Sequence, residues 1–366
     1  MTLRIAIVGC GKIADSHIEQ VRAVGKGTVV AVCDREALMA EQLAVRFDIP
    51  AHYTDISRML AEQSVDVVHI ATPPDSHVAL STLVFRAGCH VFLEKPVALT
   101  GHETRQILDA ATQANRKLCI NYLYNFEAPS LELKEKLATD KLGPIVHIEA
   151  TYGYDLAGDY GVAVLSDAGH WVHRLPGKLF HNVLDHVICK LAMVMPLAPA
   201  QVTCLAFRAR PAVGNPVIDA LADELRFTLR VGDVTATAIV SAHARPVGHT
   251  MRVYGRKDSM ILDYVGRTLV PAPRQTQPSS IGRLGPAIAQ ARAYAASARR
   301  NLGRFRRYEF HFFQGMRVLL DEFYQHIETG SPAPLSHEEI LWSVDTIDAI
   351  VEQINLQANQ ARGAQA

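Results

Sequence analysis

The most constraining feature of this chain is a glycine-containing turn that joins a short apolar run to a helical pattern. Residues 3–8 form an apolar run short enough for a buried strand. The run ends at a G-x-G-x-x-A turn made by Gly9, Gly11 and Ala14. Apolar residues then recur at helical spacing as far as Gly25. The stretch therefore predicts a strand, a tight turn and a helix in immediate succession.

A second apolar run, residues 28–33, follows this helix and stops at Asp34. This order of elements, ending on an acidic residue, indicates the βαβ unit that binds dinucleotides. Gly9 permits the tight turn, Gly11 lets the backbone approach a pyrophosphate, and Ala14 keeps the helix close to the strand. The backbone N–H groups at the start of the helix would hold the phosphates.

The choice between the two nicotinamide dinucleotides depends on the end of the second strand. Asp34 is placed to accept hydrogen bonds from the adenosine ribose, and its charge would repel a 2′-phosphate. Arg35 follows directly and could instead pair with that phosphate, or be only an exposed charge. We favour NAD and leave NADP open. Lys12 and Ile13 complete the contacts expected from this segment.

Length and composition describe a two-domain protein without a nucleic-acid signature. The chain has 366 residues, enough for two hydrophobic cores. Its formal net charge is zero, so the overall charge does not point to a nucleic-acid partner. The six cysteines form no C-x-x-C pair, which fits a reducing compartment. With no apolar run of roughly 18 residues and no room for a signal peptide, we expect a soluble, cytoplasmic protein without a transmembrane segment.

The rest of the first domain alternates strands and helices, and two of its strands end in proline-containing stops. The run 66–71 ends in Thr-Pro-Pro (72–74), and the run 90–93 ends in Glu-Lys-Pro (94–96). Both stops lie at the carboxyl edge of the expected parallel sheet, where ligands of open α/β sheets bind. A last strand completes a Rossmann domain that we place at residues 1–122.

The order of these motifs resembles the glucose–fructose oxidoreductase, inositol dehydrogenase and MocA (Gfo/Idh/MocA) family. The resemblance covers nearly the whole chain, and its most specific part is the pairing of Thr-Pro-Pro with Glu-Lys-Pro. It implies a nicotinamide-dependent oxidoreductase acting on small carbohydrates or polyols. The matching motifs are Gly9-x-Gly11-x-x-Ala14, Asp34, Ala71-Thr72-Pro73-Pro74-x-x-His77, Glu94-Lys95-Pro96 and Leu142-Gly143-Pro144-Ile145.

The second domain, residues 123–366, carries the period-two alternation of an antiparallel sheet with one covered face. Apolar and polar residues alternate over 224–231, and Gly232-Asp233 then turns the chain into 234–240. The expected fold class is α/β: an N-terminal Rossmann domain with a doubly wound parallel sheet, then an α+β domain with a mostly antiparallel open sheet. In the resembling family the free face of this sheet pairs subunits, which implies a homo-oligomer, a dimer or tetramer.

The resemblance also extends the set of expected cofactor contacts to both strand stops. Thr72 and Pro73 would contact the cofactor, and His77 would cap the following helix or line the site. The full expected set is Gly9, Gly11, Lys12, Ile13, Ala14, Asp34, Arg35, Ala71, Thr72, Pro73, His77, Glu94, Lys95 and Asn121.

Lys95 is the expected catalytic group of the first domain. Hydride transfer from an alcohol carbon needs a base for the hydroxyl proton and stabilisation of charge on the oxygen. An ammonium at the carboxyl edge of the sheet, held against Pro96, can hydrogen-bond the reacting hydroxyl. A surface lysine at a strand end is the alternative, and the match to Glu-Lys-Pro favours the catalytic interpretation.

The second catalytic group of the family should follow Gly177, and here the sequence departs from the family pattern. In the family a helix carries Asp, Gly, His and Asp at set spacing. Aligned on Gly177, His181 stands where the family has its first Asp, and Asp185 where it has its His. We expect His186, one residue further on, or Asp185 to be the proton acceptor. His181 and Asn182 would then contact the substrate.

Three more residues are candidates for substrate contact. Tyr122 stands at the end of the first domain, and residues 170–174 are dense in groups that hydrogen-bond or stack on sugars, among them Trp171 and Arg174. Trp171 could equally anchor a core. The 16 histidines form no spaced set of metal ligands, so we expect no metal.

An insertion at about 266–308 does not match the family pattern. A proline-rich loop over 270–278 precedes a helix expected to start at Gly285-Pro286, and no acidic residue occurs between Ile281 and Arg307. An amphipathic helix packed on the domain, a lid or partner surface for an anionic substrate, and a weak membrane-surface helix stay open. A stripe that is mostly alanine argues against strong membrane attachment. The stripe is Leu284, Ile288, Ala291, Ala295, Ala298, Leu302 and Phe305, with Arg292, Arg299 and Arg306 beside it.

Together these features predict an NAD(P)-dependent oxidoreductase that transfers a hydride between a nicotinamide cofactor and a ring hydroxyl of a sugar, sugar nucleotide or cyclic polyol. Two alternatives remain. One is NAD-dependent glycoside cleavage by transient oxidation and elimination. The other is a non-catalytic nicotinamide-binding sensor or partner protein, which the shifted histidine and the insertion would suit.

Overall fold

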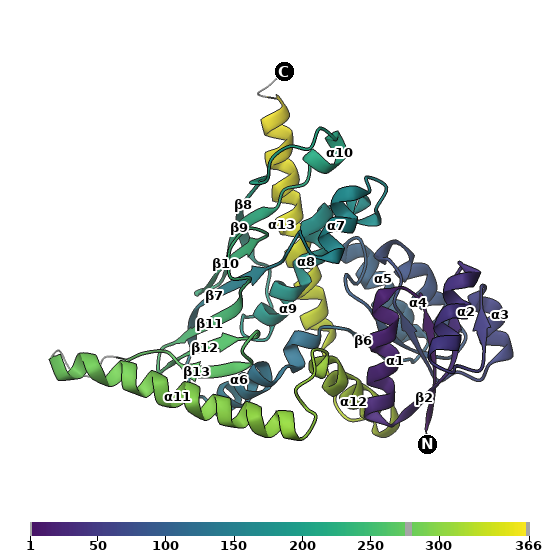
Figure 1. The fold of residues 1–366 in the computed structure, drawn as a ribbon, viewed down its shortest axis with the longest axis horizontal. Helices are drawn as coiled ribbons and strands as arrows, with labels where there is room; N and C mark the ends of the chain where they lie inside the picture. The colour runs from purple at the N-terminus through teal and green to yellow at the C-terminus, as the bar shows by residue number, and fades with distance from the viewer. Residues whose placement is uncertain (1, 275–279, 364–366) are drawn as a thin grey trace. The chain divides into compact units, whose positions relative to one another are not determined.

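The computed structural model describes residues 2–274 and 280–363, which form two compact units (Figure 1). The first unit contains Met1–Leu123 and also Gly315–Asp345. The second contains Tyr124–Gln314 and Thr346–Ala366. The sequence reading assigned everything after residue 122 to one second domain, whereas the contacts of the folded chain place Gly315–Asp345 in the first unit.

The first unit is built on a six-stranded sheet in the order β3-β2-β1-β4-β5-β6, with every strand pair parallel. This is the strand order of a doubly wound Rossmann domain, so the expected fold class is confirmed. The strands are β1 (Leu3–Val8), β2 (Gly27–Cys33), β3 (His52–Tyr53), β4 (Val67–Ile70), β5 (His90–Leu93) and β6 (Leu118–Ile120).

Helices connect these strands and cover the sheet, because a parallel strand pair needs a crossover connection. The small or apolar residues Ala14, Ile18 and Val21 of the first helix are fully buried, as its helical periodicity predicts. The helices are α1 (Lys12–Val24), α2 (Ala37–Arg46), α3 (Ile56–Glu62), α4 (His77–Arg86) and α5 (Gly101–Gln113), with a 3₁₀ turn at Pro74–Ser76. From the C-terminal part of the chain, α12 (Gln314–Thr329) and the start of α13 (His337–Gly363) complete the unit.

The second unit is built on a seven-stranded sheet in the order β13-β12-β11-β7-β10-β9-β8. Only the β7–β10 pair is parallel, so the mostly antiparallel sheet is confirmed. In β9, Leu225, Phe227 and Leu229 are buried while Thr228 and Arg230 are exposed, which is the expected one-faced alternation. The strands are β7 (Ile145–Gly153), β8 (Gln201–Phe207), β9 (Glu224–Val231), β10 (Val234–Ser241), β11 (His249–Gly255), β12 (Ser259–Asp263) and β13 (Thr268–Pro271).

One face of this sheet is covered by helices (Figure 1). At the outer strand β8, two glutamine side chains of α13 hydrogen-bond the strand backbone. Gln353 accepts from the N–H of Cys204 (3.2 Å) and donates to the carbonyl of Val202, and Gln357 bonds Ala206 and Cys204 in the same way. The remaining helices of the unit are α6 (Ala128–Ala138), α7 (Asp159–Ser166), α8 (Lys178–Val183), α9 (Asp185–Ala192), α10 (Pro216–Asp219) and α11 (Ser280–Arg306).

The inserted segment differs from its expected structure in two ways. Residues 268–271 form the edge strand β13, which includes the first two residues of the proline-rich loop expected at 270–278. Pro271 is tolerated there because it stands at the end of an edge strand, where no N–H is needed. The helix begins at Ser280 rather than at Gly285, and Pro286 lies inside its first turns. Residues 275–279 of the expected loop lie outside the described residues.

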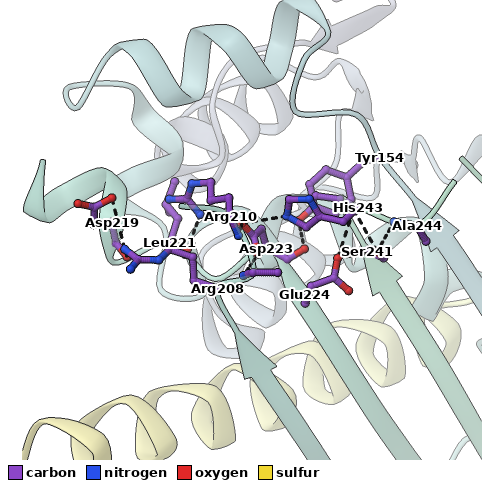
Figure 2. A network of polar contacts seen from close by, with 12 residues as sticks. Tyr154, Arg208, Arg210, Asp219, Leu221, Asp223, Glu224, Ser241, His243 and Ala244 are labelled. Atoms are coloured by element: carbon purple, nitrogen blue, oxygen red, sulfur yellow. Dashed lines mark hydrogen bonds and ion pairs between the residues drawn. The ribbon is translucent and has the colours of Figure 1, made fainter. Parts of the chain in front are cut away.

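A buried carboxylate, Asp223, stands directly before the first residue of β9 and fixes the start of this strand (Figure 2). Asp223 is fully buried and accepts hydrogen bonds from the N–H of Ala209 (2.6 Å) and from the guanidinium of Arg210 (2.9 Å). His243 Nε2 lies 3.3 Å from the same carboxylate, and the Tyr154 hydroxyl donates to the Asp223 carbonyl (3.0 Å). These bonds hold the 209–223 loop against the strand ends.

Candidate active site

The glycine turn after β1 has the geometry that dinucleotide binding requires. Gly9 adopts a left-handed φ of +93°, and a Cβ there would lie 2.7 Å from the backbone of Ala71, so only glycine fits. Gly11 caps α1, and no described heavy atom lies within 4 Å of the position of a Cβ there. Open space therefore lies beside Gly11 at the N-terminus of the 13-residue α1, where an anionic group can approach the helix.

Asp34 follows β2 and holds this turn in place. One carboxylate oxygen accepts the N–H of Cys10 at 2.7 Å, and the other accepts the N–H of Glu36 at 3.0 Å. A carboxylate has about four acceptor positions, so the bonds to the backbone leave capacity for ribose hydroxyls. Arg35 is exposed beside it. Burial, and the nearby Asp34 charge, raise the pKa of the Cys10 thiol to about 12, so this cysteine stays neutral.

His77 joins the two proline-containing loops from inside the protein. It is fully buried, with Nε2 2.8 Å from the carbonyl of Thr72 and Nδ1 3.0 Å from the carbonyl of Val97. Both ring nitrogens thus lie within hydrogen-bond distance of main-chain carbonyls, and the expected contact of His77 with the cofactor stays a prediction. His77 braces the Thr-Pro-Pro loop against the Glu-Lys-Pro loop.

Glu94 is the centre of a buried polar cluster at the end of β5. One oxygen accepts from Nε2 of His17 (2.9 Å) and from the side-chain amide of Asn121, and the other accepts the N–H of Lys95 (3.2 Å). Burial alone would raise the pKa of Glu94, but the bonds from His17 and Asn121, with the nearby Lys95 charge, outweigh burial and lower it. Glu94 is therefore a buried carboxylate that fixes the backbone at Lys95.

The cluster continues away from the sheet edge as a chain of hydrogen bonds. Nδ1 of His17 lies 3.0 Å from Nδ1 of His69, and Nε2 of His69 lies 2.9 Å from the hydroxyl of Tyr324. Nε2 of His17 bonds Glu94, so these contacts connect Tyr324 to Glu94 through the two imidazole rings. Burial, with the neighbouring His17, lowers the pKa of His69 well below its usual value, which keeps it neutral.

Sequence analysis did not assign His17, His69 and Tyr324 to the site. A signal was present, because His69 interrupts an otherwise apolar buried strand and His17 lies on the apolar face of α1. Buried polar side chains need hydrogen-bond partners, so two such histidines indicate a network. Of the remaining expected residues, Ala71, Thr72 and Pro73 lie half-buried after β4, Lys95 is half-buried, and Tyr122 is buried.

In the second unit, the expected substrate and acid–base residues gather on α8 and α9. The backbone stays helical at Leu184 between them (φ −63°, ψ −31°), so the expected one-turn spacing of His181 and Asp185 is kept. His181 and Asp185 are both 2 % exposed, whereas His186 is half-buried. Asn182 donates a hydrogen bond to the hydroxyl of Tyr160 (2.6 Å).

An aromatic cage surrounds His186, and sequence analysis missed it. The rings of Tyr124 and Tyr152 each lie 5.2 Å from the His186 ring, and both also contact His249. Lys190, fully buried, bonds Nε2 of His249, and burial lowers its pKa to about 7. Burial, and then the Lys190 charge, lower the pKa of His249 well below its usual value. Lys190 within an apolar helix was the available signal.

Trp171 and Arg174 occupy a 3₁₀ turn before α8. Trp171 is half-buried and packs against the core cluster of Val164, Val172, Leu179 and Leu221, and its ring lies 5.6 Å from that of His170. Trp171 therefore anchors a core on at least one side. Arg174 is exposed and donates a hydrogen bond to the carbonyl of Gly169 at 3.1 Å.

The residues expected to bind the cofactor thus lie in the first unit, and those on α8 and α9 in the second. Within residues 2–274 and 280–363, no group of three or more His, Cys, Asp or Glu side chains is arranged to hold a metal ion. Among the helices of this same part of the chain, none has the length and hydropathy that crossing a membrane requires.

Comparison with known proteins agrees with this geometry. Residues 3–122 match the model of the Gfo/Idh/MocA oxidoreductase family, described as an NAD-binding Rossmann fold. D-glucoside 3-dehydrogenase of Escherichia coli K12 is 31 % identical over 144 residues, which are 39 % of this chain and 41 % of that protein. The chain thus spans less than half the length of this curated relative.

Solved structures share the fold over nearly the whole chain. Levoglucosan dehydrogenase in complex with NADH superposes with a TM-score of 0.77 at 18 % identity, covering 96 % of this chain and 97 % of that one. An oxidoreductase from Agrobacterium radiobacter, solved with NAD⁺, L-tartaric acid and magnesium, gives 0.76 at 16 % identity, covering 96 % of each chain. At these identities the similarity establishes the fold.

Proposed function

We propose that this chain, whose residues 3–122 match the model of the Gfo/Idh/MocA oxidoreductase family, transfers a hydride between NAD and a ring hydroxyl of a sugar, sugar nucleotide or cyclic polyol. The observation that carries the proposal is the buried Glu94 cluster, which fixes Lys95 at the carboxyl edge of the same sheet that presents the glycine turn. A lysine with no catalytic task does not need a buried carboxylate bonded to its own N–H.

The residues at the sheet edge fit a dinucleotide. The open N-terminus of α1 at Gly11 suits a pyrophosphate, and Asp34 retains acceptor capacity for ribose hydroxyls. NAD, when bound, accepts or delivers the hydride. The protein supplies the other requirements: Lys95 donates a hydrogen bond to the reacting oxygen, and the His77 brace keeps the two loops together.

We assign the proton transfer to His186 rather than to Asp185. His186 is half-buried, so part of its ring is accessible, whereas Asp185 is 2 % exposed. The rings of Tyr124 and Tyr152 contact the His186 ring and restrict the orientation of the imidazole. His186→Asn should therefore lose turnover across the pH range. Asp185→Asn should retain the pH profile of the wild type. Loss of turnover in Asp185→Asn with a wild-type profile in His186→Asn would instead assign the proton transfer to Asp185.

The role of Lys95 is tested with a panel of sugars, sugar nucleotides and inositols, followed by NADH absorbance. Lys95→Ala should lower kcat by about 10²–10⁴-fold, because the oxygen loses its hydrogen-bond donor in the transition state. NADH affinity measured by calorimetry should stay unchanged. Lys141→Ala, an exposed lysine, is the control. Near-normal turnover of Lys95→Ala would remove Lys95 from the mechanism, and absence of NAD binding by the wild type would refute the proposed function.

We further propose that copies of the chain pair through the open face of the seven-stranded sheet. Leu205, Phe207 and Ile239 are 56 %, 41 % and 39 % exposed on this sheet. Apolar side chains grouped on a sheet face favour burial against a partner. Light scattering of Leu205→Glu against wild type tests the pairing.

A further inference from the structure

The inserted helix α11 packs on its own domain through small residues. The side facing β12 and β13 carries Ala293, Ala296 and Ser297, and Ser297 is 1 % exposed. Arg304 and Arg300 on the same side bond the carboxylate of Glu132, at 2.7 and 3.3 Å. This side of the helix therefore lies against the second unit, with a cavity of about 440 Å³ between Ala293 and Ala296 of the helix and Met260 of β12.

The large apolar side chains of α11 lie on the opposite side. At about 3.6 residues per turn, Leu284, Ile288 and Leu302 lie about 140° to 180° around the helix from Ser297, and Phe305 lies on its flank at about 80°. Leu284, Ile288, Leu302 and Phe305 are 64 %, 51 %, 49 % and 65 % exposed. Of the three interpretations that the sequence left open, a helix packed on the domain through this stripe is not what the structure shows: small residues lie inward, and the large apolar ones of the stripe are exposed.

Two more exposed aromatic side chains follow the end of the helix. Tyr308 is 86 % exposed and Phe312 is 73 % exposed. Many large exposed apolar side chains on one segment are uncommon on a monomer without a partner. We call the stripe together with Tyr308 and Phe312 the outer face of α11.

The charge beside the outer face has a single sign. Arg292, Arg299 and Arg306 are exposed along its flank, and within the part of the chain that the structure describes none of them has an ion pair. No acidic residue occurs between Ile281 and Arg307. A second copy of α11 would thus bring only further arginines, with no carboxylate to pair with them. A partner that complements this surface is therefore anionic, and it also offers an apolar region that the exposed apolar side chains can contact.

We propose that the outer face of α11 binds the surface of an anionic phospholipid membrane, with the helix lying in the interface plane. Its 27 residues span about 40 Å, and arginines beside an exposed Leu, Ile and Phe stripe are the pattern of an interfacial helix. The three central alanines bury little area, so binding depends on charge and is reversible. This inference does not rest on the proposed function.

The test is flotation of the full-length protein with vesicles of phosphatidylcholine containing about one-third phosphatidylglycerol, beside pure phosphatidylcholine. We expect flotation with the anionic vesicles only, and release at about 0.5 M salt, where the Debye length falls to a few ångströms. Arg292→Gln with Arg299→Gln should weaken binding about 25-fold, at about fivefold per arginine. Ile288→Glu with Phe305→Glu should abolish it.

The matched control is Val213→Glu, which places a carboxylate on a valine that is 63 % exposed elsewhere in the second unit and should float like wild type. Melting curves confirm that the exposed substitutions leave the fold intact. No flotation of the wild type, or flotation unchanged in Ile288→Glu with Phe305→Glu, overturns the proposal. A third result also overturns it. If the wild type binds no vesicles and light scattering shows that Ile288→Glu with Phe305→Glu dissociates an oligomer, the outer face of α11 binds a second copy of the chain instead.

Discussion

At the scale of single residues, Gly9 and Gly11 of the same turn have different roles. Gly9 is needed for the fold, because its φ is left-handed and a Cβ would meet the backbone of Ala71 at 2.7 Å. Gly11 has an ordinary φ of −73° and open space in front of it, so the folded chain tolerates a side chain there. Only the ligand would be excluded.

This difference gives a paired prediction for alanine at each position. Gly9→Ala should lower the free energy of unfolding by about 1–3 kcal/mol or more, measured by denaturant unfolding. Gly11→Ala should unfold like wild type but weaken NADH binding by about ten- to a hundredfold in calorimetry, since a methyl group overpacks the approach of the phosphates. Equal effects of both substitutions on stability would contradict this division.

The motif residues Gly9, Gly11 and Asp34 were accessible to sequence analysis because local spacing determines their roles. The partners of Glu94 were not, since His17 and His69 come from elements far from it along the chain. His186 was named as a candidate, but the tyrosines around it come from residues 124 and 152, which no local pattern connects.

At the scale of elements, the start of β9 depends on the buried carboxylate of Asp223. Asp223 is fully buried, and its ion partner Arg210 has only 8 % of its side chain exposed. Burial would raise the pKa of Asp223, but the bonds from Ala209, Arg210 and His243 outweigh burial and lower it. The unfolded chain thus binds this proton more readily than the folded chain does.

Asp223 should therefore contribute stability above its unfolded pKa of about 3.9, and this contribution is lost as pH falls through the lower pKa of the folded state. Asp223→Asn should cost about 3–5 kcal/mol at neutral pH, because Arg210 stays buried without its counter-charge. The difference from wild type should shrink below about pH 4. Denaturant unfolding between pH 3 and pH 7 measures it, with exposed Asp233→Asn as control. A difference independent of pH would exclude this linkage.

Element patterns in the sequence predicted β9 and β10 well, because period-two burial is local and strong. They failed where the deciding contact is distant. The β13 strand exists because β12 pairs with it, and α11 starts before Pro286 although that proline suggested a helix start there. The outward direction of the apolar stripe of α11 was also not readable, since periodicity identifies a face but not what covers it.

At the scale of the whole molecule, the first unit includes a segment from the C-terminal part of the chain, Gly315–Asp345. Leu319, Leu320, Phe323 and Tyr324 of α12 are fully buried in it. Arg317 donates to the carbonyl of Ala23 at 2.9 Å, linking α12 to the end of α1. Local patterns favour contiguous domains, and so the sequence reading could not anticipate a segment about 200 residues downstream of its domain.

A chain ending at residue 314 should therefore fail to form a stable first unit, although it contains every residue of the nucleotide motif. Loss of four buried side chains exposes the partners they cover, at about 2–5 kcal/mol for each large residue. NADH calorimetry and circular dichroism should show lost binding and a lost melting transition. A chain ending at Gly363 is the control. NADH binding by the shorter chain would show that α12 is dispensable.

The glutamines of α13 have a consequence for association between molecules. A carboxamide offers one donor group and one acceptor, as a peptide group does. Gln353 and Gln357 therefore bond two N–H groups and two carbonyls of β8 in the place of a strand. An incoming strand of another chain would first have to displace both side chains. The edge strand β8 is thus protected against pairing with a strand of another chain, which is a route to aggregation.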